Sequence, residues 1–219
     1  MKITLTNFRG SSFCRYRLYE CNDAFPAFSG VLESGNIYYF FSDFCCGSWA
    51  AVNCIGGNGM VDDFSKIEID NNPSNTKDRL LLSAWVAEKT NKKFGISFHK
   101  TARKLIADGL KRSNTHISLD DVIDLFSISE GRIDRPVSQW SGEIFNITMA
   151  IGFARGKKIY CFPWISEFEM NRIEGCWEQI QTLKRKDSII LIPAAENNFL
   201  KSHCDGIIKI KKTGVEFDV

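Results

Sequence analysis

The sequence predicts an α/β protein with a largely parallel sheet. Four segments, at 37–41, 158–163, 188–193 and 205–211, are predicted to be buried strands, and the first of them is a continuous apolar run. Segments with helical spacing separate the later runs, and this alternation favours parallel strands joined by helices. A β-rich N-terminal part and a helix-rich middle add to this plan.

The N-terminal half begins with short alternating segments that are typical of strands, and Gly35-Asn36 predicts the turn before the first buried run. A polar turn over 42–48 then leads to a short helix that Gly56-Gly57 ends. The predicted elements are strands at 2–8, 16–20, 25–32, 37–41, 67–69 and 80–86, and a helix at 49–55.

The middle of the chain, from about 97 to 128, is predicted to be helical. Ser118 is a candidate helix cap, and Asp120-Asp121 gives that helix an acidic first turn. The predicted helices are 100–110, 118–126, 142–155 and 172–183.

Composition excludes several classes of function. The 219 residues are 44% hydrophobic and 25% charged, with a formal net charge of +2, so a general nucleic-acid surface is not indicated. No apolar run reaches the roughly 18–20 residues that cross a bilayer, and the N-terminal segment lacks the apolar core of a signal peptide. We therefore expect a cytoplasmic chain that can dock on a membrane partner.

Eight cysteines are present, none of them at C-x-x-C spacing, and this argues against a structural zinc site. Without a secretion signal we expect no disulfides, and most of the thiols are expected to be buried like small hydrophobic side chains. The cysteines are Cys14, Cys21, Cys45, Cys46, Cys54, Cys161, Cys176 and Cys204.

The segment from Gly35 to Ala50 resembles the strand and phosphate loop, G-x-x-x-x-G-K-[ST], of the ABC transporter ATPases. The count places Ser42 at the first glycine and Gly47 at the last, with Cys45 and Cys46 before Gly47. Ser48 then stands at the lysine and Trp49 at the Ser/Thr that would hold Mg²⁺.

Other segments resemble the same family in order and spacing. Trp85-Val-Ala-Glu88 is similar to the segment that ends in the Q-loop glutamine, with Glu88 at that position. The strand before Walker B ends here in Pro163 and Trp164, where the family has Asp-Glu. Ala194 stands at the switch histidine, and 205–214 is similar to the closing hairpin.

Gln139-Trp-Ser-Gly-Glu143 resembles the signature motif LSGG-E/Q. Counting back from Ala154 places Trp140 at the serine. Counting forward places Trp140 at the leucine, Ser141 at the serine and Gly142 at the first glycine, and we prefer this count because it keeps a large apolar residue at the leucine. It leaves Ser141 and Gly142 at a helix start, where free N–H groups can meet a phosphate. A plain serine helix cap is the alternative.

The resemblance implies a P-loop NTPase-like ABC ATPase fold over residues 1–219. Its core would be about 1–88 and 156–219, with a helical subdomain at about 89–155. It also implies that the site has lost its chemistry: the phosphate-binding lysine, the metal-binding and general-base residues of Walker B and the switch histidine are all replaced.

We therefore predict a pseudo-ATPase subunit of an ABC-type transporter. It would need no cofactor of its own beyond weakly bound ATP or Mg²⁺, and its partners would be an ATP-competent cassette and a membrane permease. One alternative is a regulatory protein that reuses the fold without a transporter. Another is a thiol-based enzyme in which Cys45 or Cys46 acts with His99, His116 or His203.

Overall fold

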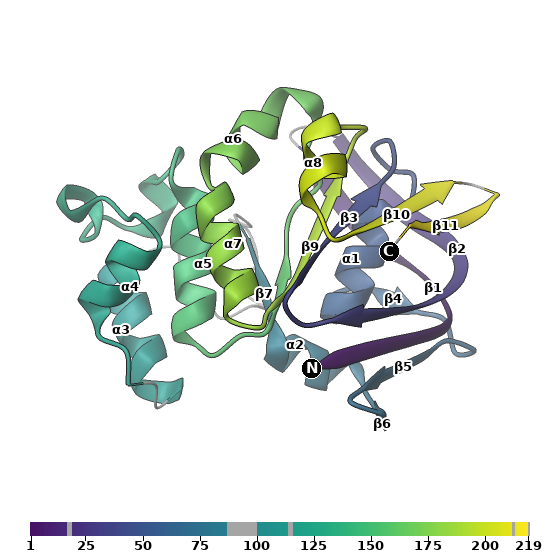
Figure 1. The fold of residues 1–219 in the computed structure, drawn as a ribbon, viewed down its shortest axis with the longest axis horizontal. Coiled ribbons are helices and arrows are strands. Elements are labelled where there is room, and N and C mark those ends of the chain that lie inside the picture. The colour runs from purple at the N-terminus through teal and green to yellow at the C-terminus, as the bar shows by residue number, and fades with distance from the viewer. Residues whose placement is uncertain (17–18, 87–99, 114–115, 212, 219) are drawn as a thin grey trace.

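The computed structural model describes residues 1–16, 19–86, 100–113, 116–211 and 213–218, and these form two β-sheets with helices around them (Figure 1). Among these residues, the larger sheet has six strands in the order β11-β10-β3-β9-β8-β7. Its neighbours are parallel except β10 and β11, which form an antiparallel hairpin. The other sheet is antiparallel, in the order β2-β1-β5-β6, with β4 paired to β1. The predicted α/β class with an N-terminal antiparallel part is confirmed.

The elements change in character along the chain, from strands at the start to helices in the middle and alternating strands and helices at the end. The strands are β1 (Lys2–Tyr16), β2 (Tyr19–Glu33), β3 (Asn36–Phe41), β4 (Met60–Val61), β5 (Lys66–Ile69), β6 (Asn72–Pro73), β7 (Ser83–Trp85), β8 (Ile159–Cys161), β9 (Ile189–Ala194), β10 (Gly206–Lys211) and β11 (Gly214–Asp218). The helices are α1 (Ser48–Gly56), α2 (Thr76–Leu82), α3 (Ala102–Ser113), α4 (Leu119–Leu125), α5 (Ile144–Ala154), α6 (Met170–Gly175), α7 (Trp177–Arg185) and α8 (Asn198–His203), with short 3₁₀ turns η2 (Glu130–Arg132), η3 (Val137–Gln139) and η4 (Glu167–Glu169).

The N-terminal hairpin pairs two long strands, β1 and β2. Ile3 and Leu5 are buried in the alternating pattern of a strand, but the next buried residue is Phe8 rather than residue 7. The register shifts between Leu5 and Phe8, and Asn7 there has a positive φ of 47°. This irregularity is of the β-bulge kind. After it, the even-numbered residues Ser12 and Cys14 are buried in place of the odd-numbered ones.

Two predicted strands were wrong in their extent. The segment 16–20 is not a separate strand, because Tyr16 pairs with Tyr19 at the end of one long hairpin, while residues 17–18 lie outside the described part. The segment 80–86 is helical up to Leu82, and only Ser83–Trp85 is a strand. A capping box, in which Asn75 and Asp78 each accept from the other's backbone N–H, starts α2 and extends it into the apolar run.

The six-stranded sheet separates two hydrophobic cores. Alternate side chains of β3 point to opposite faces of the sheet and so belong to different cores. Ile37 and Tyr39 pack toward the helical region, while Tyr38 and Phe40 pack toward α1. The first core contains side chains of α3, α4, α5 and α7, and the second contains side chains of α1, β1, β2 and β5. Helix α1 therefore lies between the two sheets (Figure 1).

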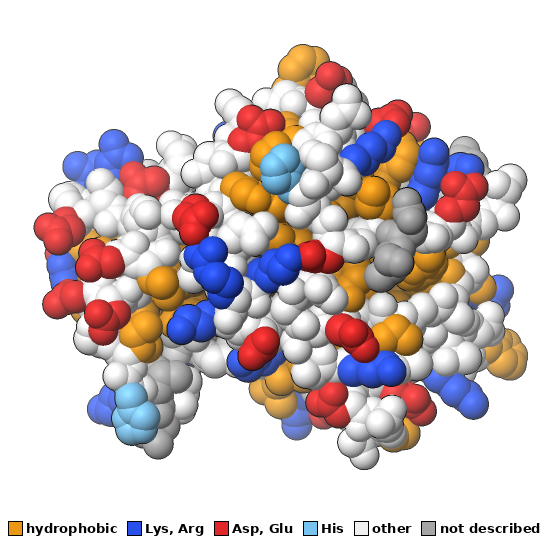
Figure 2. Space-filling view, viewed as in Figure 1, with side chains coloured by type: hydrophobic (Ala, Val, Ile, Leu, Met, Phe, Trp, Pro, Cys, Tyr) orange, Lys and Arg blue, Asp and Glu red, His pale blue; other side chains and the backbone are white. Residues whose placement is uncertain are grey.

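The helical region contains α3, α4 and α5, as predicted for the middle of the chain. The proposed subdomain boundaries at about 88 and 156 stay a prediction. Among the described helices, none is long and apolar enough to cross a membrane. On the face shown in Figure 2, acidic and basic side chains are interspersed.

Tyr160 offers a test of the central sheet. It is fully buried on β8, and among the described residues its hydroxyl has no hydrogen-bond partner. An unpaired buried hydroxyl costs roughly 1–3 kcal/mol. Tyr160→Phe is therefore expected to raise the free energy of unfolding by about 1 kcal/mol or more, measured by urea denaturation.

The matched control is Tyr38→Phe in the same sheet. The Tyr38 hydroxyl accepts hydrogen bonds from the backbone N–H of Glu33 at 2.7 Å and from Asn36 Nδ2 at 3.3 Å. Its loss leaves the Glu33 amide without this acceptor, so stability should fall by about 1 kcal/mol. If both substitutions lower stability equally, the Tyr160 hydroxyl has a partner in solution.

Candidate functional site

The candidate site is the loop between β3 and α1, residues 42–47. It lies at the carboxyl edge of the parallel strands, the edge where open α/β sheets bind ligands. Gly47 precedes α1 with φ of 108°. A Cβ at this position would lie 2.9 Å from Phe25 Cβ and 2.8 Å from Ile210 Cγ2, so the close approach of the loop to β2 and β10 requires glycine.

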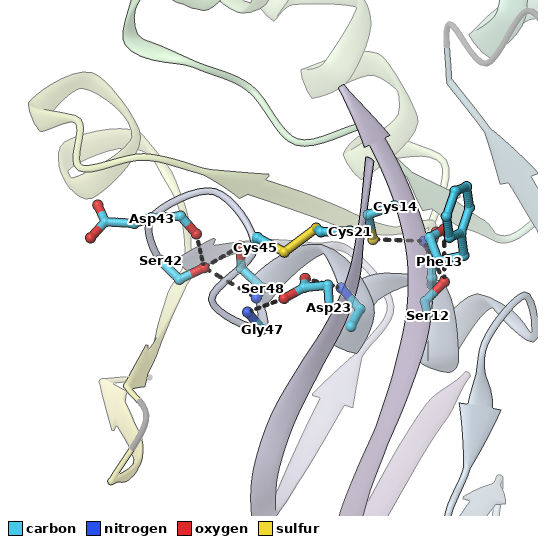
Figure 3. The surroundings of a disulfide bond; sticks show 12 residues. Ser12, Phe13, Cys14, Cys21, Asp23, Ser42, Asp43, Cys45, Gly47 and Ser48 are labelled. Carbon is cyan, nitrogen blue, oxygen red and sulfur yellow. Dashed lines mark hydrogen bonds between the residues drawn. A yellow bond between two sulfur atoms is a disulfide. The ribbon is translucent and has the colours of Figure 1, made fainter. Parts of the chain in front are cut away.

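A carboxylate of the chain itself occupies the amino end of α1 (Figure 3). Asp23, in β2, accepts hydrogen bonds from the Gly47 N–H at 2.7 Å and the Ala50 N–H at 3.0 Å. A negative charge is favourable at this end of a helix, where N–H groups lack partners within the helix.

The Asp23 side chain is deeply buried, since the residue is only 1% exposed. Burial raises the pKa of Asp23 above its ordinary value, and the backbone hydrogen bonds from Ala50, Gly47 and Ala24 oppose that rise without cancelling it.

Two buried serines, one at each end of the loop, are hydrogen-bonded to each other. The hydroxyl groups of Ser42 and Ser48 are hydrogen-bonded at 2.7 Å, and the Ser48 N–H donates to Ser42 Oγ at 3.1 Å. Both residues are buried. Ser48, which the sequence predicts to stand at the position of the phosphate-binding lysine, therefore points into the protein.

Aromatic rings cover the other side of the loop. Trp164 is 7% exposed, and its indole Nε1–H donates to the Ser42 carbonyl at 3.2 Å. The Phe44 ring lies 5.2 Å from the Trp164 ring and 6.3 Å from the Trp49 ring, between centroids. Trp49 is half-buried on α1. The two tryptophans are thus connected through Phe44, which the sequence did not single out.

The structure brings together three segments that the sequence linked only by resemblance. The Ser42 N–H donates to the Ala194 carbonyl at 3.2 Å, and Ile165, next to Trp164, forms a parallel bridge with Ala194. The half-buried Pro163 precedes Trp164. The loop, the Walker B position and the switch position therefore meet at one edge of the sheet, although their roles stay predictions.

The expectation that the chain has no disulfides was wrong. Cys21 in β2 is bonded to Cys45 in the loop, with their Cα atoms 6.4 Å apart. Cys21 lies two residues before Asp23, and Cys45 lies two residues before Gly47. Because Asp23 and Gly47 are hydrogen-bonded to each other, β2 and the loop run side by side (Figure 3). Sequence could not show this, because the pairing depends on where the hairpin lies against α1.

The signature-like segment lies at the start of α5. Trp140 is buried, and Ser141 and Gly142 are exposed. Helix α5 begins at Ile144, two residues later than predicted, and its cap residue is Glu143. The alternative in which Ser141 caps the helix is therefore wrong. The Glu143 carboxylate instead accepts from the Ser129 N–H at 3.0 Å and pairs with Arg132.

The other residues that the sequence singled out have different surroundings. Glu88 and His99 lie outside the described residues. Cys45 is in the disulfide, and Cys46 is a half-buried thiol. His116 is exposed, and the exposed His203 stacks on Phe199. Within the described ranges, no group of three or more His, Cys, Asp or Glu side chains is placed to hold a metal ion.

Comparisons of the sequence alone find no relative: no protein-family model matches it, and no curated protein matches it. Solved structures do match. One, described as the ATP binding subunit of an ABC transporter, superimposes with a TM-score of 0.70 and 14% identity, over 100% of this chain and 90% of that one.

A second match is a dimeric ATP-binding cassette in a post-hydrolysis state bound to ADP and Pi, with a TM-score of 0.70, 13% identity, and coverage of 99% and 97%. This chain has the fold of an ABC transporter ATP-binding cassette. A protein from Pyrococcus furiosus, described as a putative ABC transporter ATP-binding protein, matches with a TM-score of 0.66 and 13% identity, over 96% of this chain and 98% of that one. The fold implied by the resemblance in sequence is therefore confirmed.

Asp23 gives the stability of the chain a pH dependence that can be measured separately. Its folded-state pKa lies above the ordinary value of 3.8, so the folded chain holds this proton more tightly than the unfolded chain. The stability of wild type relative to Asp23→Asn should therefore fall as the pH rises from 3.8 through the folded pKa, and then level off. Urea denaturation of both proteins across this range measures the difference.

Asp62 is the matched control with the opposite sign. Its side chain is 29% exposed, and hydrogen bonds from the Phe64 N–H and Arg9 lower its pKa. Wild type should therefore be more stable than Asp62→Asn at neutral pH and lose that advantage as the pH falls through the lowered pKa. If the stability difference between wild type and Asp23→Asn stays constant with pH, while that between wild type and Asp62→Asn changes, the Asp23 carboxylate is exposed to water in solution.

Proposed function

We propose that this chain is a cassette subunit of an ABC-type transporter that does not hydrolyse ATP. The fold supports the first part of the proposal, since the solved structures that it resembles are described as ATP-binding subunits and cassettes of ABC transporters. The loop at the amino end of α1 supports the second part.

The observation that supports it most is the Asp23 carboxylate on the N–H groups of Gly47 and Ala50. A phosphate that approached this helix end would meet a negative charge already there. Two like unit charges 4 Å apart repel by about 4 kcal/mol at an effective dielectric constant of 20. Ser48 has no positive charge to offset this repulsion, and its side chain is already hydrogen-bonded to Ser42.

The neighbouring positions lack groups for the chemistry of hydrolysis. Pro163 has no side-chain atom that can coordinate a metal, and Ala194 has no polar side chain. The indole of Trp164 is a donor only, and it donates to the Ser42 carbonyl. A general base or a metal ligand would have to come from outside these positions.

Mg-ATP is therefore expected neither to be hydrolysed by the purified chain nor to stabilise it. A ligand at a hundredfold excess over its Kd stabilises the folded state by about 2.7 kcal/mol. Thermal melts with and without millimolar Mg-ATP, run beside an ATP-competent cassette, measure the effect. An upshift comparable to that of the competent cassette, or ATP turnover above background, would overturn the proposal.

We further propose that the chain pairs with an ATP-competent cassette and docks with it on a membrane permease, at the inner face of the membrane. Cassettes of this fold associate so that one subunit's signature segment faces the partner's ATP. Here Ser141 and Gly142 are exposed beside the amino end of the 11-residue helix α5. They can meet the γ-phosphate of ATP held by the partner.

Replacing Gly142 with Asp tests this role. A Cβ at Gly142 has no atom within 4 Å, so Gly142→Asp should fold normally. In the complex it puts a carboxylate against the partner's phosphate, and the partner's ATPase rate should fall about tenfold or more, corresponding to about 1.4 kcal/mol. The rate is measured on the co-expressed complex, whose assembly is checked by gel filtration.

The matched control is Gly175→Asp at the end of α6. Gly175 is also exposed with no atom within 4 Å of an added Cβ, and the substitution adds the same charge on a different helix. It should leave the rate unchanged. An assembled Gly142→Asp complex with full activity would mean that this chain serves only as a scaffold.

A further inference from the structure

A third cysteine lies beside the Cys21–Cys45 disulfide. Cys14 on β1 is directly opposite Cys21 in the register of the β1–β2 hairpin. It remains a thiol and is 1% exposed. Figure 3 shows Cys14 next to the disulfide, at the place where the hairpin meets the loop.

The hairpin register places the Cys14 and Cys21 side chains on one face. Directly opposite residues of an antiparallel pair have Cβ atoms about 4.5–5.5 Å apart. That face is the inner one, because Asp23 and Phe25, which follow Cys21 at two-residue intervals, are buried. Disulfides span Cα separations of about 4.4–6.8 Å, which covers the usual spacing of such a pair.

A hydrogen-bond donor also faces the Cys14 sulfur. Asn53, buried on α1, donates from Nδ2 to Cys14 Sγ at 3.9 Å and to Ser12 Oγ at 3.1 Å. A donor of this kind stabilises the thiolate, which is the reactive form of cysteine. Asn53 is therefore placed to support a nucleophilic sulfur at Cys14.

We propose that Cys14, Cys21 and Cys45 form an intramolecular thiol–disulfide exchange site. The Cys14 thiolate attacks Sγ of Cys21, the Cys14–Cys21 bond forms, and the Cys21–Cys45 bond breaks. The Cys45 sulfur leaves as a thiolate and takes up the proton that Cys14 gave to solvent. One disulfide and one thiol are present before and after, so the step needs no external oxidant or reductant.

The exchange changes which segments are covalently joined. Before it, the disulfide joins β2 to the loop at the amino end of α1. Afterwards, the disulfide lies within the hairpin, and the loop is held to β2 by the hydrogen bonds of Asp23. The inference concerns the loop and hairpin alone and does not depend on the proposed transporter role.

The positions of the protease sites allow a direct test. Trypsin cleaves after Arg15 and Arg17, so Cys14 leaves in the peptide 10–15, while Cys21 and Cys45 share the peptide 18–66. A Cys14–Cys21 disulfide joins these two peptides, and the Cys21–Cys45 disulfide does not. Glutamyl endopeptidase, which cleaves after Glu33, then separates Cys21 from Cys45 and confirms the connection by mass.

The oxidised full-length chain is incubated with iodoacetamide, which traps any Cys45 thiol that exchange releases. We expect the joined peptide to accumulate with Cys45 alkylated. In Cys14→Ser both signals should be lost, and in the control Cys46→Ser both should persist, because Cys46 takes no part in the step. Absence of the joined peptide in wild type, or equal alkylation of Cys45 in Cys14→Ser, would overturn the proposal.

Cys45→Ser keeps the test decisive if Cys14→Ser folds poorly. This variant lacks the leaving thiol, so oxidation by glutathione disulfide should form the Cys14–Cys21 bond and release two molecules of glutathione. Thermal melts verify that each variant is folded. A folded Cys45→Ser chain that carries glutathione on Cys21, or that keeps both thiols, would show that the two sulfurs cannot bond.

Discussion

The contact between the Asp23 carboxylate and the first amides of α1 determines how the rest of the site is arranged. It joins the antiparallel sheet to the helix that lies between the two sheets. A buried charge is tolerated only where several donors compensate for the loss of water. Here the donors are backbone N–H groups, so the position of the hairpin fixes the path of the loop, and the loop in turn fixes where α1 begins.

The polar groups of the candidate site are bonded to other groups of the protein. Polar atoms that face a ligand in an open site are here paired with one another: Ser42 with Ser48, the Ser42 carbonyl with Trp164, and the Ser42 amide with the Ala194 carbonyl. The Phe44 ring of the same loop packs near the rings of both Trp49 and Trp164. The contacts that hold the loop are therefore distributed over several elements, from α1 and the loop after β3 to β9 and the segment that follows β8.

Periodicity predicted the parts of the fold that depend on local sequence. The strands β3, β8 and β9 are continuous apolar runs and β10 alternates between buried and partly exposed residues, so their positions were predicted within a few residues. The extent of β1 and β2 was missed, because a bulge near Asn7 breaks the alternation. Helix α2 was missed, because its capping box precedes an apolar stretch that also fits a strand.

The sequence predicted where the candidate site lies, but not which residues make the contacts within it. The order of motifs placed the loop at Ser42–Trp49 and the facing positions at Trp164 and Ala194, and the structure brings these segments together. Asp23, Cys21 and Phe44 were not found, because their roles arise from contacts between segments more than twenty residues apart or from packing within the loop. No local pattern marks a residue whose function is to lie against a distant helix.

The alternation of β3 between the two hydrophobic cores has a consequence for how the chain unfolds. Neighbouring side chains of this one strand belong to different cores, so neither core can open without removing support from the other. Regions that share a central strand in this way lose their structure together rather than as independent units. The helical region and the antiparallel sheet should thus melt in one cooperative transition, although they lie on opposite sides of the molecule.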